Sequence, residues 1–186
     1  MLQLVTAELL SQSDTSFSGS NVAGGGLVGA GGALLYSTAY ENNPTRGGQA
    51  RLGTPNPASR YGWDRTFHFD FDNRSGYHFN ADIGPLQRFN HARIPGSLYR
   101  LGSTSVLRGL GRASVVGGLA FDAYDLATAG PGGYGRAVGG IAGGWGGALG
   151  GAAIGSFVAP GPGTVIGGFL GGVFGGVGGQ YVGDEF

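Results

Sequence analysis

Glycine recurs at every fourth residue towards the end of the chain, and this spacing constrains the fold more than any other feature. One run holds Gly139, Gly143, Gly147, Gly151 and Gly155, and a second holds Gly163, Gly167, Gly171, Gly175, Gly179 and Gly183. Residues four apart lie one above the other on the same face of an α-helix. The sequence Pro160-Gly161-Pro162-Gly163 separates the runs with a turn that no continuous helix crosses. The pattern predicts a glycine-zipper helical hairpin.

A membrane explains why so many helical glycines are tolerated. Each one costs about 1 kcal/mol relative to alanine in water, whereas in lipid small residues let helices approach closely enough to hold together. Residues 141–159 and 165–182 each match a hydrocarbon core of about 30 Å, and no charged residue occurs between Ala137 and Gly183. A flexible low-complexity tail is the alternative, but random enrichment does not place glycine on two regular grids. We therefore expect membrane association, with Arg136 and Asp184 in one aqueous phase while the Pro160 turn enters the bilayer.

The charge distribution predicts a basic head between two weakly charged flanks. Net charge is zero, and all eleven basic residues are arginine. Residues 41–112 hold ten of these arginines and five acidic residues, a net charge of +5, so the head is suited to phosphate of lipid or nucleic acid. Cysteine is absent, which excludes disulfides and thiolate metal sites. Residues 1–10 lack the basic residues of a secretory signal, so we expect delivery by another route or as a piece of a larger protein.

Residues 65–83 alternate between aromatic and polar side chains, which is typical of a β-hairpin. The aromatic face is expected to form core, and the other face gathers His68, Asp70, Asp72, His78, Asn80 and Asp82. With residues 73–77 as the loop, Asp72 would oppose His78, Asp70 would oppose Asn80, and His68 would oppose Asp82. His–Asp pairs at that separation suit acid–base chemistry or a divalent metal. A solvated polar strand face is the alternative interpretation.

The candidate catalytic residues are the polar groups of this hairpin and the third histidine of the chain: His68, Asp70, His78, Asn80 and His91. No resident cofactor is predicted, although the His/Asp face offers ligands for a divalent metal. The candidate helix-packing residues are the zipper glycines from Gly139 to Gly179. No P-loop and no HExxH motif is present.

The remaining segments predict a four-part chain of α+β class. Residues 1–60 hold a linker and a helix with a third small-residue stripe at Gly25, Gly29 and Ala33. Residues 61–97 form the β-hairpin head, residues 98–129 an amphipathic helix or pair of helices, and residues 130–186 the zipper. The expected fold is a small β-hairpin-containing head followed by helices and a membrane-associated glycine-zipper hairpin.

The segment GRASVVGGLAFDAYDLATAG, together with the zipper that follows it, resembles the C-terminal ends of bacterial polymorphic toxins. These toxins are of the Rhs, contact-dependent inhibition and LXG kinds, and the resemblance covers residues 111–186. It implies an antibacterial effector that is released into a competitor and neutralised at home by an immunity protein. HFDFDNRSGYHFNADIG resembles strands found upstream of such modules, without a defined enzyme family. Small glycine-zipper envelope lipoproteins are also similar, but they need a lipidated cysteine.

Three functions follow as hypotheses. The first is a secreted or delivered toxin that inserts the zipper into a target membrane and permeabilises or depolarises it. The second is a nuclease that uses the histidine cluster, with nucleic acid as its partner and the zipper aiding membrane passage. The third is a non-toxic envelope protein. Under the first, the expected partners are membrane lipid, a cognate immunity protein and other copies of the chain.

Overall fold

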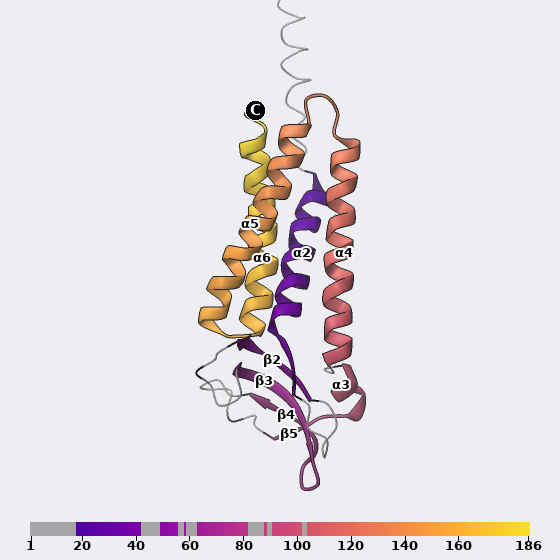
Figure 1. The fold of residues 1–186 in the computed structure, drawn as a ribbon, viewed down its shortest axis with the longest axis vertical. Coiled ribbons are helices and arrows are strands. Elements are labelled where there is room, and N and C mark those ends of the chain that lie inside the picture. The colour runs from indigo at the N-terminus through magenta and orange to yellow at the C-terminus, as the bar shows by residue number, and fades with distance from the viewer. Residues whose placement is uncertain are drawn as a thin grey trace, which may run out of the picture.

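The structure, a computed structural model, describes residues 18–41, 49–55, 58, 63–81, 88, 91–101 and 104–186. Within this part, long helices form a bundle, and a small antiparallel sheet lies at one end of it (Figure 1). The bundle helices are α2 (Gly19–Ser37), α4 (Thr104–Thr128), α5 (Tyr134–Val158) and α6 (Pro162–Gly183). The short helix α3 (Gly96–Leu101) joins the sheet to α4. The mixture of helices and sheet confirms the predicted α+β class.

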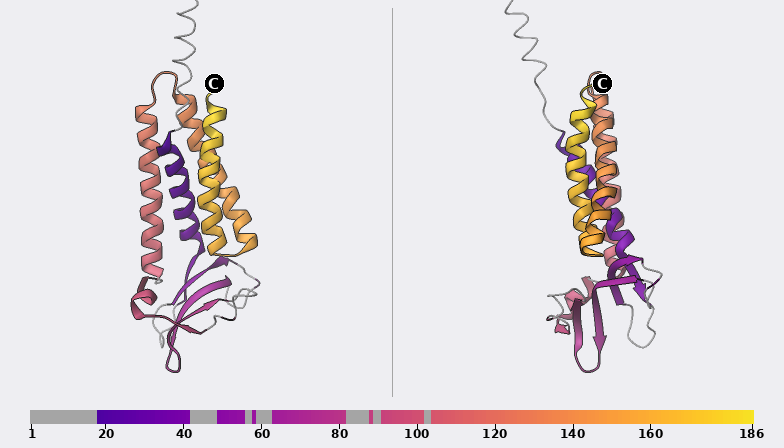
Figure 2. Two further views of the ribbon diagram at one scale, coloured as in Figure 1. Left: turned by 180° about the vertical axis from the view of Figure 1, so that it is seen from behind. Right: turned by 90° about the vertical axis from the view of Figure 1, so that its left-hand side faces the viewer.

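Helices α5 and α6 form an antiparallel hairpin closed by the proline–glycine turn. Pro162 begins α6, where its missing N–H costs nothing. Gly161 has a φ of 89°, and a Cβ on it would lie 2.8 Å from the backbone nitrogen of Gly53. Only glycine fits this left-handed position against the sheet. The turn therefore shares one end of the bundle with the sheet, and the C-terminus lies at the opposite end (Figures 1 and 2).

Helix α2 lies in the middle of the bundle, with α4 on one side and the α5–α6 hairpin on the other (Figure 1). The stripe of small residues at Gly25 and Gly29 is what lets α6 approach: a Cβ on either glycine would clash with a backbone carbonyl of α6. The helix predicted over residues 22–36 is therefore a central element. It also joins residues 1–60 and 130–186 in one bundle, although these were expected as separate parts of the chain.

The sheet is a meander in which each strand pairs antiparallel with the next. Its strands are β1 (Thr38–Glu41), β2 (Gln49–Pro55), β3 (Trp63–Asp72), β4 (Gly76–Ala81) and β5 (Ala92–Arg93). The predicted hairpin corresponds to β3 and β4. Its strands belong to a larger sheet that the alternation alone did not indicate.

The predicted register of the β3–β4 hairpin is wrong by two residues. Asp70 pairs with His78 and His68 pairs with Asn80, whereas Asp72 pairs with Gly76. The expected pairing of His68 with Asp82 is excluded, and Asp82 itself lies outside the described residues. The cause is Gly76, whose φ of 68° closes a shorter turn over residues 73–75. A shift of two keeps every side chain on its predicted face.

Candidate functional site

The contact between α5 and α6 consists of glycine backbone. A Cβ added to any glycine of the α5 stripe would lie closer than 3.0 Å to the carbonyl oxygen of a glycine on α6. The facing pairs are Gly135–Gly183, Gly139–Gly179, Gly143–Gly175, Gly147–Gly171, Gly151–Gly167 and Gly155–Gly163. These pairs contain every glycine of the two predicted runs. Any side chain at these positions has to push the two helices apart.

A second surface of small residues on the same hairpin faces α2, and the sequence reasoning missed it. A Cβ on Gly144 would lie 3.0 Å from the Cα of Gly25, and Cβ atoms on Gly168 and Gly172 would meet carbonyls of α2. These residues are the second members of glycine doublets in the sequence. One position along a helix rotates the side-chain direction by about 100°, so the doublets were the signal for a second packed face.

Large apolar side chains lie on the outside of the bundle instead of in its interior. Among the described residues, the buried hydrophobic ones are small or medium in size: Val28, Ala33, Ala81, Ala137 and Ala148. Leu149 on α5 is 74% exposed and Phe157 is 94% exposed, and many others on α4, α5 and α6 are also exposed. Helices α5 and α6 are both long and apolar enough to cross a membrane. This distribution is the reverse of the one that water favours.

Charged and tyrosine side chains lie near the two ends of the helices. Exposed tyrosines occur near the sheet on α2 and near the opposite end on α4, α5 and α6: Tyr36, Tyr124, Tyr134 and Tyr181. Along α4, no charged side chain is exposed from Ala113 to Thr128, because Asp122 and Asp125 are buried. Tyrosines at the level of the headgroups and an uncharged surface between them are typical of membrane-spanning bundles.

Buried polar side chains hold the helices together at the end of the bundle away from the sheet, which we call the open end. Asp125 accepts hydrogen bonds from the hydroxyls of Ser18, at 2.7 Å, and Ser20. Asp122 accepts one from Trp145 Nε1 at 2.9 Å, which joins α4 to α5. Burial of a carboxylate is costly unless it is hydrogen-bonded or paired, so these contacts fix the position of α4 on its neighbours.

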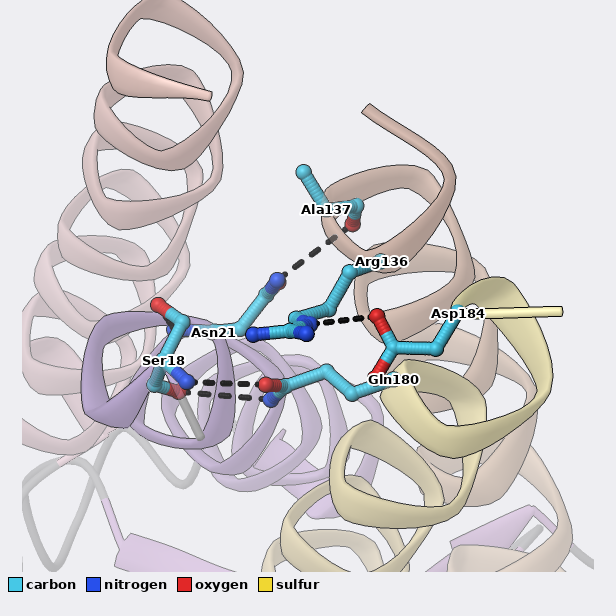
Figure 3. Close-up of polar contacts among 6 residues, drawn as sticks. All are labelled: Ser18, Asn21, Arg136, Ala137, Gln180 and Asp184. Atoms are coloured by element: carbon cyan, nitrogen blue, oxygen red, sulfur yellow. Dashed lines mark hydrogen bonds and ion pairs between the residues drawn. The ribbon is translucent and has the colours of Figure 1, made fainter. Parts of the chain in front are cut away.

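Gln180 and Arg136 complete the open end (Figure 3). The side chain of Gln180 accepts from the backbone N–H of Ser18 at 2.8 Å and donates to its carbonyl oxygen at 3.2 Å. Arg136 at the start of α5 pairs with Asp184 just after α6, so the hairpin is also closed by charge. Gln180 is the one amide side chain within the charge-free zipper, and that isolation was its signal in the sequence.

A cavity of about 170 Å³ lies beside these groups at the open end. Its lining comes from the start of α2, the end of α4 and the start of α5: Ser18, Asn21, Asp125, Thr128, Ala129, Gly133, Arg136 and Ala137. Asn21 is 1% exposed and donates from Nδ2 to the carbonyl oxygen of Ala137 at 3.3 Å. The sequence analysis placed no site here, because the lining residues are far apart in the chain.

Three of the five candidate catalytic residues come together in the sheet. The rings of His78 and His91 lie 4.9 Å apart, and the backbone N–H of His91 donates to Asn80 Oδ1 at 2.9 Å. His68 and Asp70 lie opposite Asn80 and His78 on β3 by their backbone register, and their side chains are outside what the structure describes.

The expected solvated polar face is wrong for β4. His78 is 1% exposed and Asn80 is 5% exposed, whereas Tyr77 on the aromatic face is 42% exposed. The reason is that the segment containing His91 and β5 covers the polar side of β4. Among the described side chains, no group of three or more His, Asp or Glu residues is placed to hold a metal ion.

Comparison of the chain with protein-family models, curated proteins and solved structures gave no match.

Proposed function

We propose that this chain is a polymorphic-toxin effector that inserts its helix bundle into the membrane of a target bacterium and depolarises it. The observation that carries the proposal is the reversed packing of the bundle. Glycine backbone fills the interior, and large apolar side chains such as Leu149 and Phe157 cover the outside. In lipid this arrangement satisfies both sides, since small residues pack helix on helix and the outer side chains meet acyl chains.

The dimensions of the bundle agree with this proposal. Helix α6 has 22 residues, which gives about 33 Å at 1.5 Å per residue, close to a hydrocarbon core of about 30 Å. The sheet would then lie at one membrane surface and the Arg136–Asp184 pair at the other. The toxin assignment itself rests on the resemblance of residues 111–186, which also implies an immunity protein as partner.

Reconstitution of the purified full-length chain into phospholipid vesicles tests the proposal. The vesicles carry a potassium diffusion potential, which is followed with a potential-sensitive dye. We expect the chain to float with the vesicles in a density gradient and to dissipate the potential in a dose-dependent way. Flotation without dissipation would favour the non-toxic envelope protein. A monomeric chain that remains in solution and ignores the vesicles would contradict membrane insertion.

The nuclease hypothesis is a second candidate because the structure brings His78, Asn80 and His91 together. Burial of His78 argues against it, since a general acid or base has to reach its substrate. The double variant His78→Ala, His91→Ala is expected to keep full vesicle depolarisation and full toxicity in bacterial expression. Loss of toxicity in a double variant that still depolarises vesicles would instead support the nuclease.

A further inference from the structure

We propose that the cavity at the open end of the bundle binds a monovalent metal cation. Two side chains that line the cavity each have a buried oxygen without a hydrogen-bond partner in the described part of the chain. These oxygens are Oδ2 of Asp125 and Oδ1 of Asn21. Asp125 is 6% exposed and Asn21 is 1% exposed, so bulk water does not solvate either oxygen.

Both of these oxygens are acceptors, so they cannot satisfy each other. The two hydroxyls that bond Asp125 reach its other oxygen, Oδ1. Neutral hydroxyl donors also leave the carboxylate charge uncompensated, and a buried charge without a counter-ion is strongly unfavourable. A small cation placed between the carboxylate and the amide oxygen would remove both costs.

The composition of the lining selects the class of cation. The side chains of Ser18, Asn21, Thr128 and Asp125 offer oxygen and no sulfur or imidazole, which suits hard ions and not transition metals. One carboxylate balances one positive charge, so a divalent ion would remain half compensated. Neutral protein oxygens near helix ends are also the usual ligands of sodium inside helical membrane proteins.

Arg136 also lines the cavity, but its charge is already engaged. Its Nε donates to Asp184 Oδ1 across the ends of α5 and α6. The aspartates and the arginine around the cavity therefore sum to one negative charge, which the cation would neutralise. This site does not depend on whether the bundle crosses a membrane, so its test is separate from vesicle depolarisation.

The test uses the full-length chain purified in mild detergent, with the thermal unfolding midpoint followed by circular dichroism. Sodium, potassium or lithium chloride is compared with N-methyl-glucamine chloride at equal ionic strength, because that organic cation is too bulky for coordination by the two oxygens. A concentration tenfold above the dissociation constant is expected to raise the midpoint by roughly 3 to 6 °C for the preferred ion. Direct binding of radioactive sodium, with the other ions as competitors, gives the stoichiometry.

Asp125→Asn is expected to abolish both the shift and the binding. Asp122→Asn is the matched control, because Asp122 is an equally buried aspartate on the same helix that does not line the cavity. It should keep the ion response even if its own midpoint changes. Asn21→Ala, which keeps Asp125, is expected to weaken binding at least tenfold and serves if Asp125→Asn does not fold. A wild-type chain with neither an ion-dependent shift nor bound sodium would overturn the proposal, leaving water or a proton at Asp125. An equal response in wild type and a folded Asp125→Asn variant would overturn it as well.

Discussion

Gly147→Leu is expected to separate α5 from α6 and to destabilise the bundle by at least about 3 kcal/mol. Gly147 lies near the middle of the hairpin, where its Cα hydrogen faces the carbonyl oxygen of Gly171. A Cβ there would lie inside 3.0 Å of that oxygen. The obstacle is backbone and not a flexible side chain, so the clash is relieved only if the helices move apart. The midpoint of unfolding in detergent and the depolarisation of vesicles should both fall.

The adjacent residue provides the matched control. A Cβ on Gly146 would have no atom within 4 Å, so Gly146→Leu is expected to change stability little. Both substitutions raise helix propensity by the same amount, up to about 1 kcal/mol. The difference between the two variants therefore isolates the contact of α5 with α6. Equal stability and equal activity of the two variants would show that the glycine contact does not hold the bundle together.

The sequence predicted the helical part of the fold well because its signal is local. A four-residue grid of glycine interrupted by Pro160 leaves little freedom in where α5 and α6 begin and end. The stripe at Gly25 and Gly29 likewise marked a helix, although its position between α4 and α6 depends on contacts distant in the chain. Local spacing identifies a packing face and does not identify which helix packs on it.

The sheet was harder to predict because its details depend on one backbone conformation and on long-range cover. A left-handed Gly76 shortened the turn and moved the register by two residues. Alternation gave the two faces of β4 correctly, yet it could not show that the segment around His91 buries the polar one. Polarity predicted exposure, whereas the structure satisfies Asn80 by a hydrogen bond from the backbone.

The open-end cavity could not be predicted because it joins the start of α2 to the ends of α4, α5 and α6. Gln180 bonds Ser18 across 162 residues of sequence. Asp122 and Asp125 were recognised as the acidic end of an amphipathic helix, and a solvated surface was the natural interpretation. Their three-residue spacing places them on one face, and in a membrane bundle that face is the interior.

Leu149→Arg is expected to prevent insertion of the chain into vesicles. Leu149 is 74% exposed and lies in the central part of α5. If the outer surface of the bundle contacts acyl chains, arginine at this depth costs about 3 kcal/mol or more relative to leucine, so the inserted fraction should fall more than a hundredfold. If the surface contacts water, an exposed arginine should change stability by less than about 0.5 kcal/mol. The same substitution therefore has opposite outcomes under the two interpretations.

Phe157→Arg distinguishes depth in the membrane from the chemistry of arginine. Phe157 is even more exposed, at 94%, but it lies one residue before the end of α5 beside the sheet. An arginine there can extend its guanidinium to the headgroups, which lowers the cost. We therefore expect Phe157→Arg to float with vesicles nearly as well as the wild type, while Leu149→Arg remains unbound. If both variants and the wild type behave alike, the outer face of α5 is not in contact with lipid, and the bundle is a water-soluble assembly with an unusually apolar surface.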